Sequence, residues 1–203
     1  MNITLRTSGL FATNSYLLTD ADAVYLVDAP DDNGRMLSLI REKGRLDAVL
    51  LTHGHFDHVM GLRDVLSLFP SPTVYLASPD HYYIRDDKTG NREYIKWFGI
   101  PENEYTVPAD IPLLDYPEKI GNIKVIRTPG HTPGSVSLLL ENEGVLLSGD
   151  TLFDGGEGRV DIGGDYTCLM ESLKKILRLD GKVRVMPGHG GFTTIEDERR
   201  RLF

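Results

Sequence analysis

The chain has 203 residues, with 30 acidic against 22 basic side chains and a formal net charge of −8. Apolar residues (Ala, Val, Ile, Leu, Met, Phe, Trp, Tyr and Cys) make up 40% of it, which is ordinary for a globular protein and excludes a disordered chain. The acidic balance argues against nucleic acid or an anionic membrane as a partner. At this length a single domain over residues 1–203 is expected.

The lone cysteine, Cys168, excludes an intramolecular disulfide and a multi-cysteine metal site, and it suits a reducing compartment. No apolar stretch approaches the roughly 18 residues of a membrane span. The first residues lack the basic and apolar blocks of a signal peptide. We therefore expect a cytoplasmic protein without a membrane partner. Cys168 falls on a predicted helix and is expected to pack in the core.

The first half of the chain alternates short apolar runs with helical patterns. Turn residues separate the strands, and Gly44 and Pro70 end two of the helices. The expected strands lie at 3–6, 15–18, 23–28, 46–51 and 73–77, and the expected helices at 33–43, 60–69, 79–87 and 92–98.

The second half repeats the alternation. Strands are expected at 123–127, 136–140, 145–147 and 183–186, and a helix at 167–179 with its apolar residues on one face. Thr193 followed by Glu196 is a capping-box pattern that predicts a C-terminal helix. Strands interleaved with helices in two similar halves indicate a layered α/β protein whose helices cover its sheets.

Three histidines and an aspartate follow directly after the expected strand at 46–51. His53 and His55 are two residues apart, so they project to the same side of an extended segment. Asp57 and His58 fall where the chain turns into the next helix and can reach a second position. Burying these groups unpaired would cost roughly several kcal/mol. Metal ligation explains the arrangement better.

Three further candidates occupy equivalent places. His131, Asp150 and His189 each follow an expected strand and have glycine or proline beside them, and strand ends are where α/β proteins build sites. Five histidines and two aspartates exceed one tetrahedral site and predict two metal ions that share an aspartate. The donor types fit zinc first, with iron or manganese as alternatives. His81 is expected to be a surface or helix-capping histidine.

This pattern resembles the signature of the metallo-β-lactamase superfamily, which is His-x-His-x-Asp-His with a later His, Asp and His. The resemblance runs from about Ile3 to the end of the chain, and all seven positions are present. It implies an α/β fold, the αββα four-layer sandwich of that family, with two zinc-type sites at one edge. It also implies a first metal on His53, His55 and His131, a second on Asp57, His58 and His189, and Asp150 bridging both.

Within that family, the segment from Gly149 to Gly164 is most similar to the glyoxalase II group, closest to its short bacterial members. These enzymes hydrolyse thioesters such as hydroxyacylglutathione. The best-known β-lactamases place a cysteine where Asp150 stands, and the nucleic-acid-processing branches carry an additional domain. Full-length glyoxalase II continues into a helical domain that helps to hold glutathione, whereas this chain stops at Phe203, so the use of glutathione stays open.

The resulting hypothesis is a dinuclear metallohydrolase of small thioesters or esters. A hydroxide that bridges the two metals is the nucleophile, and Asp57 and Asp150 are the catalytic residues. Arg159 has two interpretations, either binding a substrate carboxylate or forming a structural ion pair. Thr52 and Thr132 either hydrogen-bond ligating groups or are ordinary turn residues.

Two alternatives remain open. The first is a mononuclear iron persulfide dioxygenase that would use His53, His131 and Asp150. The second is a non-catalytic metal-binding or sensing protein. In each enzymatic case the partner is a small molecule, and for the hydrolase it is a thioester that can be anionic.

Aromatic residues gather in the segment 81–116. They form either a lid or dimer surface over the metal site or local core packing, so a homo-oligomer is left open. Phe11 and Asn14 either border the pocket or, for the asparagine, form a turn.

Overall fold

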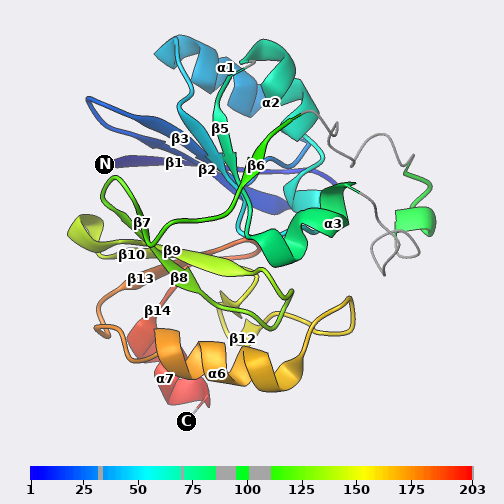
Figure 1. Ribbon diagram of the computed structural model, residues 1–203. Helices are drawn as coiled ribbons and strands as arrows, with labels where there is room; N and C mark the ends of the chain where they lie inside the picture. Colours follow the sequence, from blue (N-terminus) through cyan, green and yellow to red (C-terminus); the bar gives the residue numbers. More distant parts are fainter. Residues whose placement is uncertain (32–33, 70, 86–94, 101–110, 203) are drawn as a thin grey trace. The chain divides into compact units, whose positions relative to one another are not determined.

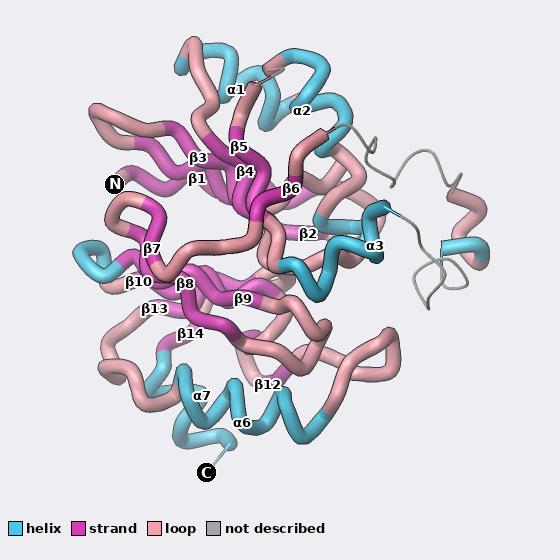
Figure 2. The backbone as a smooth tube through the Cα atoms, viewed as in Figure 1, coloured by secondary structure: helices cyan, strands magenta, loops and turns pink. Residues whose placement is uncertain are grey.

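The computed structural model describes residues 1–31, 34–69, 71–85, 95–100 and 111–202. The chain divides into two compact units, an N-terminal unit of Met1–Asp115 and a C-terminal unit of Tyr116–Phe203. Each unit contains a mixed β-sheet with flanking helices (Figures 1 and 2). This confirms the α/β class expected from the alternating pattern.

The N-terminal unit is built on a six-stranded sheet in the order β1-β2-β3-β4-β5-β6. Its first three strands are antiparallel and its last four are parallel, with β3 common to both sets. The strands are β1 (Asn2–Ser8), β2 (Thr13–Thr19), β3 (Val24–Val27), β4 (Ala48–Leu50), β5 (Thr73–Tyr75) and β6 (Leu113–Leu114).

Two helices provide the crossovers between parallel strands, α1 (Arg35–Lys43) from β3 to β4 and α2 (Leu62–Leu68) from β4 to β5. Helix α1 buries Met36 and Ile40 against the sheet and ends at Gly44, whose positive φ of 70° lets its N–H reach the Arg41 carbonyl. Short turns η1 (Phe56–His58) and η2 (Ser78–Asp80) precede α2 and α3 (His81–Arg85), respectively.

The C-terminal unit has a second six-stranded sheet in the order β14-β13-β10-β9-β8-β7, in which only β10 and β13 pair in parallel among the described strands. Its strands are β7 (Lys119–Ile120), β8 (Ile123–Arg127), β9 (Val136–Leu140), β10 (Val145–Gly149), β13 (Arg184–Pro187) and β14 (Thr193–Thr194). Beside it lie η3 (Glu141–Glu143), the hairpin β11 (Leu152–Phe153) and β12 (Gly156–Glu157), and helices α6 (Tyr166–Ile176) and α7 (Ile195–Leu202).

The structure corrects two sequence predictions in the C-terminal unit. Cys168 is exposed, because the buried face of α6 is set by Leu169, Leu173 and Ile176 and the cysteine lies beside that face. The residue that caps α7 is Thr194, not Thr193: the Thr194 hydroxyl accepts the Asp197 N–H at 3.2 Å and donates to the Asp197 carboxylate at 2.7 Å.

The remaining element predictions agree with the structure to within a few residues. The expected helix at 79–87 is η2 followed by α3, with 86–87 outside the described residues. Of the expected helix at 92–98, residues 92–94 lie outside them too, whereas Ile95 and Lys96 are helical and 97–98 form a turn. None of the helices in the described part of the chain is long and apolar enough to cross a membrane.

Candidate metal centre

The N-terminal unit gathers four of the predicted ligands in the loop that follows β4. The rings of His53 and His55 are 4.8 Å apart between centroids and meet edge to face, and those of His53 and His58 are 4.2 Å apart. The Nε2 atom of His58 lies 3.6 Å from the Asp57 carboxylate. All three histidines are buried, so this polar cluster is held inside the unit by specific partners.

Asp28, which the sequence reasoning missed, is the partner that holds this loop. It is 1% exposed and directly follows β3 with a positive φ of 55°. Its carboxylate accepts three hydrogen bonds, each of 2.8 Å, from the N–H of Thr52, the hydroxyl of Thr52 and Nδ1 of His58. A signal was available, because Asp28 ends the strand next to the one that carries the histidines.

Two tautomers follow from these bonds. A carboxylate only accepts, so the neutral ring of His58 carries its proton on Nδ1. The Thr52 hydroxyl donates to Asp28, so its oxygen accepts from Nδ1 of His53 at 3.1 Å. Both rings then carry the lone pair on Nε2, the form in which a histidine ligates a metal. Thr52 therefore contacts one of the predicted ligands, His53.

Close packing fixes the backbone between His53 and His55. The Gly54 N–H donates to the buried Asp80 carboxylate at 2.9 Å. A Cβ on Gly54 would stand 2.8 Å from the Cβ of Tyr83, so a side chain does not fit there. Tyr83 in turn places its ring edge to face against His55, at 5.4 Å between centroids.

Asp57 receives a hydrogen bond of 3.0 Å from the hydroxyl of Thr13 on β2. The neighbouring Asn14 accepts one of 2.7 Å from Thr7, a bond between β1 and β2 and not a turn. Phe11 packs edge to face on Phe56 of the histidine loop, at 5.4 Å between centroids. The first hairpin therefore contacts this loop.

The C-terminal unit gathers the other three predicted ligands. Oδ2 of Asp150 lies 3.6 Å from Nε2 of His131 and 3.4 Å from Nε2 of His189. The parallel pairing of β10 and β13 explains this closeness, because Asp150 and His189 each follow one of the two strands. The Gly188 N–H also donates to the Gly149 carbonyl at 2.9 Å.

His131 has the same tautomer as the two histidines of the N-terminal unit. Its Nδ1 lies 2.7 Å from the backbone carbonyl of Arg159, which only accepts, so the proton is on Nδ1 and the lone pair on Nε2. Gly158 makes this contact possible. A Cβ there would stand 1.9 Å from the Asp150 carbonyl oxygen and 3.0 Å from Nδ1 of His131.

The side chain of Arg159 forms an ion pair, which is one of the two roles that the sequence suggests for it. Its guanidinium donates to both carboxylate oxygens of Asp161, at 2.6 and 2.5 Å. That bidentate pairing lowers the pKa of Asp161 to about 2. The contribution of Arg159 to the candidate centre is its carbonyl, which sequence reasoning missed because any residue type can supply it. Thr132 hydrogen-bonds Ser135 at 2.7 Å within its own turn.

The other singled-out residues have structural contacts. His81 is the first residue of α3, and its Nε2 lies 2.8 Å from the carbonyl oxygen of Leu76. In the segment 81–116, Tyr83 is buried whereas Trp97 is 83% exposed, so neither core packing nor an exposed surface describes the whole segment. Tyr94 and Tyr105 lie outside the described residues.

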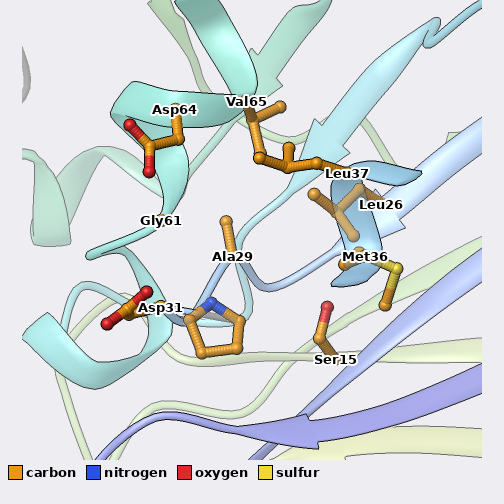
Figure 3. Close-up of a pocket in the computed structure, with 10 residues that line it drawn as sticks. Ser15, Leu26, Ala29, Asp31, Met36, Leu37, Gly61, Asp64 and Val65 are labelled. Carbon is orange, nitrogen blue, oxygen red and sulfur yellow. The ribbon is translucent and has the colours of Figure 1, made fainter. Parts of the chain in front are cut away.

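A small cavity in the N-terminal unit lies between α1, α2 and the end of β3, and its walls include Ala29, Met36 and Val65 (Figure 3). Its volume of about 20 Å³ is room for a single water molecule. None of the seven predicted ligands lines it, so it is no substrate pocket.

All seven predicted ligands belong to groups of histidine and aspartate side chains that could hold metal ions, which is consistent with a dinuclear metal site. The donors are imidazole nitrogens and carboxylate oxygens, the set that zinc, iron and manganese accept.

Comparison with known proteins agrees with these observations. The family model described as the Metallo-beta-lactamase superfamily matches residues 8–189. The chain is 33% identical to the "Probable metallo-hydrolase YqgX" of Bacillus subtilis (strain 168), over 94% of this chain and 91% of that protein. It is 30% identical to the hydroxyacylglutathione hydrolase GloC of Haemophilus influenzae, over 98% and 96%.

Among solved structures, TTHA1623 in a di-iron-bound form superimposes with a TM-score of 0.85 and 32% identity, over 98% of each chain. This likeness confirms the fold that the sequence resemblance implied, with two mixed sheets and flanking helices.

Proposed function

Because the chain belongs to the metallo-beta-lactamase superfamily, we propose that it is a metal-dependent hydrolase of small thioesters or esters that works with two divalent metal ions. The observation that carries the proposal is the common tautomer of His53, His58 and His131. Separate acceptors hold the proton of each ring on Nδ1 and leave the lone pair on Nε2.

The proposed ligand assignment is the one that the family resemblance implies. His53, His55 and His131 would hold the first metal, Asp57, His58 and His189 would hold the second, and Asp150 would serve both. Zinc is the proposed metal, and the di-iron form of the similar protein TTHA1623 makes iron the first alternative. When bound, the ions supply Lewis acidity, which acidifies a water molecule and stabilises the charge that develops on the attacked carbonyl oxygen.

The chain's own residues have separate tasks in this proposal. Asp57, held by Thr13, orients the attacking water and accepts its proton. Asp28 and Thr52 hold two imidazoles in the ligating tautomer. Asp150 is the shared carboxylate. The guanidinium of Arg159 is paired with Asp161, so the proposal gives it no role in binding the substrate.

A thioester is the proposed substrate class because the relative GloC is named a hydroxyacylglutathione hydrolase. The proposed setting is a single-domain cytoplasmic enzyme acting on a small, anionic thioester. Its acyl and thiol groups are to be found by assay.

The test combines metal analysis of the purified protein with hydrolysis assays carried out in the absence of oxygen. The substrates are S-lactoylglutathione, a simple acyl thioester and an aryl ester. We expect about two metal ions per chain and turnover of at least the thioesters. Asp150→Ala should lose most of the metal and the turnover together, whereas Asp180→Ala, which changes an exposed aspartate of the same unit, should lose neither.

Other outcomes separate the alternatives. One iron per chain with oxygen consumption on a persulfide, unaffected by loss of His189, would identify a dioxygenase. Bound metal without turnover of any acyl substrate would identify a metal-binding or sensing protein.

A further inference from the structure

Glu198 of α7 is the one buried carboxylate among the described residues of the C-terminal helix, at 0% exposure. An ionised group inside a protein is costly unless hydrogen bonds compensate it. Three donors do so here. They are the hydroxyl of Thr193 at 2.6 Å, the N–H of Gly155 at 3.1 Å and the guanidinium of Arg201 at 2.8 Å.

Two of these donors, Gly155 and Thr193, belong to the two loops that carry candidate metal ligands. Gly155 stands five residues after Asp150 in the β11–β12 hairpin, and Thr193 stands four residues after His189 at the start of β14. The pairing of β10 with β13 holds the strand at the start of each loop in place. Glu198 holds the last part of each loop through Gly155 and Thr193, so both loops are held at their two ends.

Further contacts join the same two loops. Arg201, besides contacting Glu198, donates to the Asp154 carboxylate at 2.7 Å. That carboxylate lies 3.6 Å from where a Cβ on Gly191 would stand, two residues beyond His189. The ring of Phe153 meets the imidazole of His189 edge to face, at 6.2 Å between centroids. Between Asp150 and His189 themselves the separation is 3.4 Å.

We propose that Glu198 is a positioning residue for the second metal, because it sets the placement of His189 relative to Asp150 from behind the two loops. It does not touch the metal ligands. The inference rests on the proposed dinuclear function, and it assigns α7 a role in metal affinity beyond covering the sheet.

The design compares four proteins: the wild type, Glu198→Ala, Glu198→Gln and the control Glu196→Gln. Alanine removes all three contacts. Glutamine keeps an oxygen for the Gly155 N–H, and its NH₂ can donate to the Thr193 hydroxyl, but that NH₂ cannot accept from Arg201, so glutamine should rescue part of the effect. Glu196 lies on the same helix and pairs only at the surface with Arg200 in the contacts described here, so its variant should behave as wild type.

The experiment titrates each metal-free protein with Co²⁺ and follows the visible absorption of the bound ion. In wild type we expect two binding events. In Glu198→Ala the second should weaken about tenfold, at the lower end of the 10–100-fold range for outer partners of metal ligands, with a changed spectrum of the second ion and an unchanged first event. Thermal unfolding of each metal-free protein shows that it is folded.

Equal weakening of both events in Glu198→Ala, or an unchanged second event, would overturn the positioning role. If Glu198→Ala fails to fold, Thr193→Val removes one of the three contacts and should weaken the second event selectively, and a wild-type titration for that variant would overturn the role as well. A wild-type protein that takes up a single Co²⁺ would instead overturn the dinuclear function on which the role depends.

Discussion

Replacing Asp28 by asparagine tests the tautomer argument while keeping the size of the side chain. The carboxylate accepts from Thr52 N–H, Thr52 hydroxyl and His58 Nδ1. An amide offers one oxygen and one NH₂ group. If the amide oxygen keeps accepting from the Thr52 N–H, the NH₂ group faces Nδ1 of His58 and the Thr52 hydroxyl. His58 then accepts on Nδ1 and carries its proton on Nε2. The Thr52 hydroxyl now accepts from the amide and donates to Nδ1 of His53, so His53 also carries its proton on Nε2.

The reversed amide is no better, because its NH₂ would then face the N–H of Thr52. Two of the proposed ligands, His53 and His58, thus lose the Nε2 lone pair that a metal needs. We expect the metal affinity of Asp28→Asn to fall toward the upper end of the about 10–100-fold range for such partners, or about 1.4–2.7 kcal/mol. Metal uptake by the chelator-treated protein measures this. Asp47→Asn is the matched control, since Asp47 also accepts a backbone N–H, from Val24, but in the described contacts touches no candidate ligand.

Alanine at position 28 should act on stability as well. It leaves three donors without their acceptor, at about 1–3 kcal/mol each if they stay dry, against a typical total of about 5–15 kcal/mol. The positive φ of 55° adds strain for alanine, so Asp28→Gly should be more stable than Asp28→Ala by about 1 kcal/mol. Wild-type metal affinity in Asp28→Asn would refute the reasoning.

Two further changes have definite expected results. Gly158→Ala should abolish metal uptake, because its Cβ would stand 1.9 Å from the Asp150 carbonyl oxygen, whereas Gly156→Ala should be tolerated because nothing lies within 4 Å of that Cβ; metal analysis of both variants decides. The negative charge of Asp165 raises the pKa of the Cys168 thiol, so Asp165→Asn should lower that pKa and shift the rate of thiol alkylation toward lower pH. An unchanged alkylation profile would contradict the electrostatic cause.

The elements could be predicted from the sequence, and the candidate ligands could be singled out in it, because their signals are local. Apolar periodicity and Gly44 placed α1 (Arg35–Lys43) to within a residue or two. The spacing of His53, His55, Asp57 and His58 is a motif within one loop, and the structure places that loop after β4 as expected.

The sequence did not reveal the roles of the supporting residues, because these roles depend on contacts between residues that are distant in sequence. Asp28 acts on Thr52 and His58, 24 and 30 residues away, and Glu198 acts on Gly155, 43 residues away. Burial also decides between neighbours in a helix. Cys168 precedes the buried Leu169 yet is itself exposed on α6. The apolar character of the two residues alone does not show which of them faces the core.

The most direct test of the proposed dinuclear hydrolysis is a titration of the metal-free protein with Zn²⁺ while anaerobic thioester hydrolysis is followed. The two-metal centre predicts little turnover up to one equivalent of Zn²⁺, a steep rise between one and two, and a plateau beyond two, with no need for oxygen. Turnover that reaches its plateau at one equivalent, or that never appears although two ions are bound, would contradict it.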